Sequence, residues 1–329
     1  MKYIFHWIAI LCIFFLVLVL IQPDNKENFE NVNESPPFPI DVVYTWAGEN
    51  DSNDIRISYN NELKYSMMSV LKFLPWVNRI HVLMNPPKKV PDWLTNEMRS
   101  KVTFVDQTQT FPSQYELPNT AASAIETTLH NIPNLSEHFI FFNDDFFVGK
   151  ALPYTYFFTS DGKAFVSDLT AKSKSMVLPG KTSKLKIPLP DMGATGFYPH
   201  VPISLLKSEI TKYQEKYPDY IHWIRSIRSR KGLGCNVCEE NNLGCPCHQQ
   251  QFIIAKHMYD NNKAVLKKYE IGSSCSKKGY INSFCLDYLD DIKNNPPPTF
   301  CIQDTTENPE KKKIFKQKLN AFFQAFYGS

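Results

Sequence analysis

The stretch FIFFNDDFFVGKAL, residues 139–152, places two adjacent aspartates inside one of the most apolar runs of the chain. The Phe and Ile residues before Asp144 and Asp145 are typical of a buried strand. Ionised carboxylates are costly to bury without a partner. In open α/β sheets, ligands bind beyond the carboxyl ends of the strands. The stretch therefore predicts a strand that ends in a cleft, where Asp144 and Asp145 hold a divalent cation through oxygen, and a turn-forming role for the aspartates is the alternative.

Strand and helix patterns alternate around this stretch. Strand patterns cover residues 39–46, 79–85, 102–107 and 138–145. Helix patterns cover residues 60–77 and 118–133, the second with Asn119 as its cap. We expect loops over 160–195 and a further helix entered after His200 and Pro202. This alternation predicts an α/β domain with a mostly parallel sheet.

The N-terminal segment is a candidate membrane anchor. Residues 3–22, YIFHWIAILCIFFLVLVLIQ, are long enough to span a bilayer as a helix and have no evident small-residue cleavage site. Lys2 precedes the span and an acidic segment follows it. The positive-inside rule then predicts a single-pass type II protein, with residues 1–22 as signal anchor, 23–38 as stalk and the domain 39–329 in a lumen or outside the cell.

Composition limits the classes of partner. Hydrophobic residues make up 43% and aromatic residues 14% of the chain, which indicates a folded core. The net charge is +3 and no dense basic stripe is present, so the sequence indicates no nucleic-acid partner. The lysine-rich run at 310–318 is interpreted as the solvated face of a helix.

Seven cysteines follow the one in the predicted anchor, all of them in the last third of the chain. Four lie in CNVCEENNLGCPCH, an insertion near 232–248: Cys235, Cys238, Cys245 and Cys247. Their C-x2-C spacing suits a structural Zn²⁺ site, whereas the inferred compartment favours disulfides. Both interpretations stay open. Because seven is an odd number, disulfide pairing would leave at least one thiol free.

The helix pattern at 118–133 and the basic segment after 220 offer further candidates. Glu126 and His130 are four residues apart and suit acid–base chemistry, or else form a surface pair. Arg225, Arg228 and Arg230 could bind a phosphate group, or be solvated.

Four separated blocks, in order, resemble the Stealth family of hexose-1-phosphate transferases. They are IDVVYTW; NNELKYSMMSVLKFLPWVNRIHVLMN through FIFFNDDFFVGK; HVP with the helix after it; and FCIQDTTEN. The resemblance covers most of residues 39 to about 310 and departs after Trp46, where the chain has AGEND. It implies a Rossmann-like or GT-A-like core that binds a nucleotide-sugar, and the transfer of a hexose-1-phosphate, such as N-acetylglucosamine-1-phosphate, to a glycan hydroxyl with release of a nucleoside monophosphate.

The resemblance also implies roles for single residues. It implies Glu126, Asp145, His200 and Arg230 as catalytic residues, with Arg228 as a rival for Arg230. It implies a donor site lined by Asp41, Asn60, Glu62, Asn119, Asn143 and Asp304. Asp144 and Asp145 would bind Mg²⁺ or Mn²⁺, and either Glu126 or His200 would take the hydroxyl proton. Two alternatives are a metal-dependent GT-A-type glycosyltransferase that releases a nucleoside diphosphate, and a catalytically inactive lumenal or surface binding protein.

Overall fold

The computed structural model describes the following residues: 32, 34–48, 60–167, 201–228, 250–267, 280–281, 288–302 and 308–328. Residues 33–329 form one unit. The predicted membrane anchor lies outside the described residues. Within the described part of the chain, no helix combines the length and the apolar character needed to cross a bilayer.

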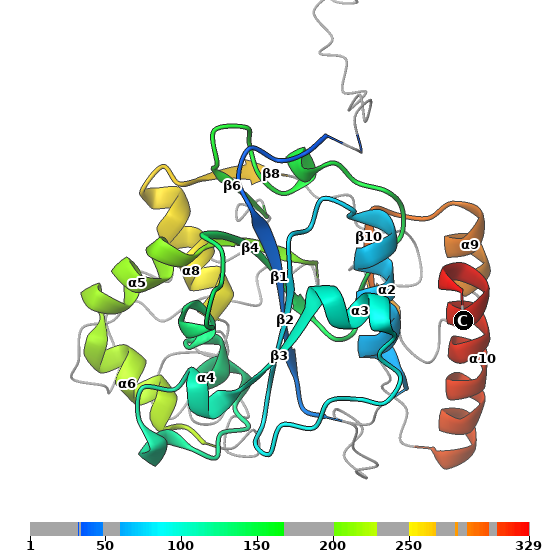
Figure 1. Cartoon of the computed structure of the whole chain (residues 1–329), viewed down its shortest axis with the longest axis horizontal. Helices are drawn as coiled ribbons and strands as arrows, with labels where there is room; N and C mark the ends of the chain where they lie inside the picture. Colours follow the sequence, from blue (N-terminus) through cyan, green and yellow to red (C-terminus); the bar gives the residue numbers. More distant parts are fainter. Residues whose placement is uncertain are drawn as a thin grey trace, which may run out of the picture. The chain divides into compact units, whose positions relative to one another are not determined.

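The central sheet has five strands in the order β3-β2-β1-β4-β7 (Figure 1). Their bounds are β1 Ile40–Trp46, β2 Ile80–Met84, β3 Val102–Asp106, β4 His138–Asn143 and β7 Ile203–Leu206. The first four are parallel, and β7 runs antiparallel beside β4. The prediction of an α/β domain with a mostly parallel sheet is confirmed.

Helices cover both faces of this sheet, which explains why its strands are continuous apolar runs rather than alternating ones. Figure 1 shows α2 on one side of β1, and α4, α5, α6 and α8 on the other. The helix bounds are α2 Glu62–Phe73, α3 Asn96–Lys101, α4 Ala122–Glu126, α5 Lys207–Lys216, α6 Pro218–Ser226 and α8 Gln250–Asp260. In α2, Leu63, Met67 and Val70 recur at helical spacing and are fully buried, so this helix packs by the stripe that the sequence predicts.

A second sheet and a second core lie beside α2. The sheet has the order β5-β10-β9, with β5 at Phe146–Val148, β9 at Tyr280–Ile281 and β10 at Thr299–Ile302. Helices α9 (Tyr288–Asn294) and α10 (Pro309–Tyr327) accompany it. Phe315, Leu319 and Phe323 of α10 are fully buried in this aromatic core, whereas the lysines of its first turns are exposed or, for Lys312, partly exposed. The solvated basic face predicted for 310–318 is therefore confirmed.

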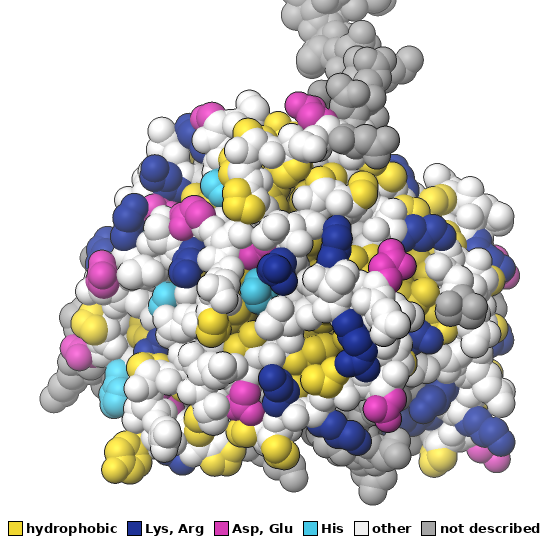
Figure 2. Space-filling view, in the orientation of Figure 1, with side chains coloured by type: hydrophobic (Ala, Val, Ile, Leu, Met, Phe, Trp, Pro, Cys, Tyr) yellow, Lys and Arg dark blue, Asp and Glu magenta, His cyan; other side chains and the backbone are white. Residues whose placement is uncertain are grey.

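A third sheet pairs β6 (Ala164–Ser167) with β8 (Ala264–Lys267) in parallel. Short 3-10 turns complete the described elements: Gln107–Gln109, Gln114–Glu116, Leu129–Asn131 and Tyr154–Tyr156. Over the face shown in Figure 2, basic and acidic side chains are interspersed.

Three predictions about elements were wrong in detail. Strand β6 lies inside the range 160–195, where loops were expected. The segment after Pro202 begins with strand β7, and α5 follows only from Lys207. The helix predicted over 118–133 is limited to α4 and the 3-10 turn at Leu129–Asn131, so Glu126 and His130 do not share one helix face. The N-cap of α4 is Ala121, although the Asn119 side chain accepts a hydrogen bond from the Ala121 backbone N–H at 2.9 Å.

Candidate active site

Asp144 and Asp145 form the two-residue turn by which the chain passes from β4 in the central sheet to β5 in the second sheet. Both side chains are partly exposed, and so is Asn143 at the end of β4. β4 runs parallel to β1, and Asn143 lies opposite Thr45 near the end of that strand. The acidic pair therefore lies, partly exposed, at the carboxyl edge of the parallel sheet.

Glu62 is the first residue of α2 and lies close enough to Asp145 for their charges to interact. The side chain is buried, and Asn60 donates to its carboxylate from both the backbone N–H and Nδ2, the latter at 2.8 Å from Oε1. Burial raises the pKa of Glu62 to about 7, and the negative charge of Asp145 adds to the rise. The structure thus brings Asn60, Glu62 and Asp145 into one acidic cluster.

Tyr44 and Ser66 form hydrogen bonds next to this cluster. The Tyr44 hydroxyl lies 2.8 Å from the Ser66 hydroxyl, which in turn donates to the backbone carbonyl of Phe146. These contacts tie β1, α2 and β5 together next to the acidic turn. Burial raises the pKa of Tyr44, and the charge of Asp144 contributes, so this hydroxyl stays neutral.

Cys301 is a member of the site that was not predicted from the sequence. Its Sγ lies 3.3 Å from Asp145 Oδ2, and the residue is a buried free thiol. In the sequence it counts as one of the seven cysteines in the last third of the chain. One feature of the sequence sets Cys301 apart from the other cysteines: it lies in the apolar run TFCI, far from the cysteine-rich insertion.

The donor set at the turn suits a hard divalent cation. Mg²⁺ commonly binds one or two carboxylates together with waters and substrate phosphates. Asp144 and Asp145 supply two adjacent carboxylates on partly exposed residues, although Oδ1 of Asp145 is itself buried. Over the described residues, no three His, Cys, Asp or Glu side chains are grouped so that they could hold a metal ion. The residues present fit a cation that is shared with a substrate.

Glu126 and Asn119 belong to a second set of contacts. The Glu126 carboxylate is buried and accepts a hydrogen bond from the Gln250 backbone N–H, at 3.2 Å, where α8 begins. Asn119 is fully buried, and its Nδ2 donates to three backbone carbonyls, those of Glu116, Arg225 and Ile227. Asn119 therefore fixes the segment before α4 against the end of α6.

Asp41 lies at the other end of the sheet, near the start of β1. It is fully buried and accepts hydrogen bonds from Asn78 Nδ2 at 2.8 Å and from the Ser136 backbone N–H at 2.7 Å, and its Oδ2 lies 3.3 Å from His81 Nε2. Burial alone would raise the pKa of Asp41, but these hydrogen bonds lower it below its usual value. The structure does not bring Asp41 together with the acidic cluster, and its contacts are those of a carboxylate that holds strands in place.

Arg225 also has structural contacts. Its guanidinium donates to the Thr127 hydroxyl and carbonyl and to Gln214 Oε1, at 2.9, 3.2 and 2.8 Å. Arg228 is exposed, and its Nη1 donates to the Leu117 carbonyl at 3.3 Å. The remaining predicted residues lie outside the described part of the chain: His200, Arg230, Asp304, Cys235, Cys238, Cys245 and Cys247.

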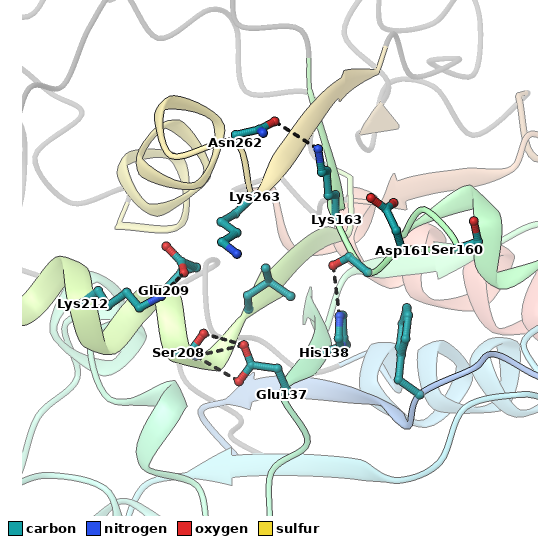
Figure 3. Close-up of a pocket in the computed structure, with 13 residues that line it drawn as sticks. Glu137, His138, Ser160, Asp161, Lys163, Ser208, Glu209, Lys212, Asn262 and Lys263 are labelled. Atoms are coloured by element: carbon teal, nitrogen blue, oxygen red, sulfur yellow. Dashed lines mark hydrogen bonds and ion pairs between the residues drawn. The ribbon is translucent and has the colours of Figure 1, made fainter.

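A polar hollow of about 500 Å³ lies at the amino end of β4, away from the acidic cluster (Figure 3). Most of its charged side chains contact their neighbours. Lys212 donates to Glu209 at 2.7 Å, Lys163 to Asn262 at 3.1 Å, and Ser208 to Glu137 at 2.6 Å. The hollow thus contains none of the residues predicted for the active site.

Comparison with known proteins places the acidic turn inside a described family region. A model of the Stealth protein conserved region 2 matches residues 56–166, which include Asn60, Glu62, Glu126 and the acidic turn.

Three relatives extend the similarity beyond that region. The capsular polysaccharide phosphotransferase fcs1 of Haemophilus influenzae is 29% identical over 94% of this chain and 89% of its own length. A capsular polysaccharide phosphotransferase of Neisseria meningitidis serogroup B is 28% identical over 93% of this chain and 88% of that protein. The capsular polysaccharide phosphotransferase cps12A of Actinobacillus pleuropneumoniae is 31% identical over 69% of this chain and 66% of that protein.

Proposed function

The chain belongs to the Stealth protein family and is a phosphotransferase, and from this premise we propose that it transfers a hexose-1-phosphate from a nucleotide-sugar to a hydroxyl group of a polysaccharide or other glycan. The names of the relatives support a polysaccharide acceptor, because they are capsular polysaccharide phosphotransferases. A Rossmann-like or GT-A-like core that holds the nucleotide-sugar is part of the proposal. So is the membrane anchor at residues 3–22, which would hold the domain in a lumen or outside the cell.

The observation that carries the proposal is the partly exposed acidic turn at the carboxyl edge of the parallel sheet, the edge where α/β folds bind nucleotides. In the reaction, the acceptor oxygen forms a bond to the phosphorus that carries the sugar. The bond from that phosphorus to the bridging oxygen breaks, and a nucleoside monophosphate leaves with the bond electrons. The hydroxyl proton passes to a base of the protein.

Positioning and charge control dominate phosphoryl transfer, because the protein has little covalent chemistry to perform. Asp144 and Asp145 would hold Mg²⁺ or Mn²⁺ by their oxygens, next to Asn143. When bound, such a cation offsets the charge that develops on phosphoryl oxygens. Asn60 and Glu62 would line the donor site at the start of α2, and Asn119 and Asp304 complete the proposed lining.

The proton would go to Glu126 or His200. The Gln250 N–H donates to one oxygen of the Glu126 carboxylate and fixes the direction of this side chain. Such a held carboxylate is suited to accept a proton from a nearby hydroxyl. Arg230 would bind the phosphate groups, since a guanidinium matches their geometry with two parallel hydrogen bonds.

The proposal is tested by the leaving nucleotide. The full-length protein in detergent would be incubated with a panel of nucleotide-sugars, a capsular oligosaccharide and Mg²⁺ or Mn²⁺, and the products read by mass. We expect a nucleoside monophosphate and an acceptor heavier by one hexose phosphate. Release of a nucleoside diphosphate with addition of a bare hexose would instead identify a glycosyltransferase and would contradict the proposal.

A further inference from the structure

Cys301 is fully buried on strand β10 of the second sheet and is not part of a disulfide. β10 pairs antiparallel with β5, and Cys301 lies opposite Phe146, the residue after the acidic turn. A buried thiol usually behaves as a small apolar group and needs no polar partner. Cys301 differs, because its sulfur faces a carboxylate.

Two adjacent residues of β10 hold Asp145. The Cys301 thiol donates to Asp145 Oδ2 at 3.3 Å, and the Ile302 backbone N–H donates to the Asp145 carbonyl at 3.0 Å. A protonated thiol can donate to an ionised carboxylate, and bonds to a charged acceptor are the stronger kind.

We propose that Cys301 is a positioning residue, which holds the Asp145 carboxylate in the orientation that phosphotransfer requires. The bond to Oδ2 sets the direction of Oδ1, while the Ile302 bond fixes the backbone of the same residue. The arrangement links the second sheet to the acidic turn, so the C-terminal part of the chain contributes directly to the geometry of the site. This inference rests on the proposed function, in which Asp145 holds the cation.

The kinetic test compares Cys301→Ala with Cys301→Ser. Alanine removes the donor, and kcat should fall roughly tenfold to a hundredfold, the effect of losing one hydrogen bond to a charged group. Serine is close in size and its hydroxyl donates, so it should restore most of kcat. The KM for the acceptor should change little in either variant. Equal impairment of the two variants, or an unaffected alanine variant, would overturn the proposal.

Thr299 supplies the matched control. It lies two residues earlier on β10, so its side chain points to the same face of the strand, and it is buried. Thr299→Ala should lower the unfolding temperature without lowering kcat. The double variant Cys301→Ala/Asp145→Asn should be no less active than Asp145→Asn alone, because Cys301 acts through Asp145. A further, independent drop in the double variant would contradict the assignment.

An infrared measurement separates this inference from the proposed function, because it needs no turnover. The S–H stretching band of Cys301, identified by its loss in Cys301→Ser, should lie at the lower frequency of a donating thiol. It should move to a higher frequency in Asp145→Ala, which removes the acceptor. A band that does not respond to Asp145→Ala would refute the hydrogen bond between Cys301 and Asp145. If the band shifts as expected but no nucleoside monophosphate is formed in the product test, only the proposed reaction is refuted.

Discussion

Replacing Asp145 by asparagine keeps the size of the side chain and removes its charge. Because Asp145 is a partly exposed turn residue that interacts unfavourably with the buried Glu62 carboxylate, the folded state should keep its stability or gain some. Activity should fall by at least about a hundredfold, the scale of losing one electrostatic group in a preorganised site. Steady-state kinetics and thermal unfolding of the same preparation measure the two effects.

Two controls accompany this variant. Asp161→Asn makes the same change in the polar hollow at the opposite end of β4, and its activity should stay near that of the parent protein. Leu129→Asp introduces a charge at a side chain that is 1% exposed, and it should damage folding first. If the Asp145→Asn protein unfolds, or folds and keeps near-normal turnover, the acidic pair is only a structural turn and the site assignment is wrong.

His130 should make stability depend on pH. Burial lowers the pKa of His130 from 6.5 to about 4, and the nearby Arg225 and Lys207 charges contribute. Between these two pH values the unfolded chain binds a proton that the folded chain does not, so the free energy of unfolding falls as the pH falls. The full contribution is present above pH 6.5, and roughly 3 kcal/mol should be lost by about pH 4.

Denaturant unfolding of His130→Gln across this pH range checks the effect. The variant should lose less stability than the parent protein as the pH falls, because glutamine does not titrate. His222→Gln is the control, since the His222 side chain is 82% exposed. A parent protein and a His130→Gln variant with the same pH slope would show that His130 does not carry the effect.

At the scale of elements, α10 holds the second core against α2. The Phe323 ring stacks on Tyr65 with centroids 4.7 Å apart and lies 4.8 Å from the ring of Phe147. Phe323→Ala should lower the free energy of unfolding by roughly 3–5 kcal/mol, the usual cost of emptying a large aromatic site. Ile314→Ala, on the same helix but at a half-exposed side chain, should change it by less than about 0.5 kcal/mol. Equal losses in the two variants would contradict the role given to Phe323.

The elements of the central sheet were predictable because each is a local pattern. The runs at 39–46, 79–85, 102–107 and 138–145 are apolar and rich in β-branched or aromatic residues, and all four became parallel strands. β7 was not predictable in this way, because ISLL is short and leads directly into the helical pattern of α5. The 118–133 helix was overestimated, because hydrogen bonds from Thr127 and Thr128 side chains to nearby carbonyls compete with a continuing helix.

The candidate site was predictable at the acidic turn and less so around it. Asp144 and Asp145 follow a strand directly, so the topology alone sends them to the carboxyl edge. Asp41 could not be located by its motif alone. The family resemblance implied a place in the donor site, whereas its hydrogen bonds with Asn78 and Ser136 hold it at the opposite edge of the sheet. Cys301 could not be placed, because its contact with Asp145 joins residues 156 positions apart, and no local pattern encodes that pairing.

At the scale of the whole molecule, the predicted topology is open to a direct test. If residues 3–22 anchor the protein with Lys2 on the cytoplasmic side, a tag at the C-terminus should resist protease in sealed membrane vesicles and be digested after detergent is added. A soluble cytoplasmic reporter serves as the control for sealing. Digestion of the tag in intact vesicles, or a mature protein that begins after residue 22, would contradict the anchor.

The contact between Cys301 and Asp145 also has a consequence for the time at which the enzyme becomes active. The central sheet is complete once β7 has been synthesised, and chains begin to fold from the N-terminal side while they are being made. β10 (Thr299–Ile302) is made only after the helices α5, α6, α8 and α9, which follow β7 in the chain. A ribosome-bound nascent chain could therefore hold a folded sheet and still lack the second sheet that fixes its acidic turn. Transfer by such a chain should be slower than transfer by a chain that includes β10, because Cys301 does not yet hold the Asp145 carboxylate in place.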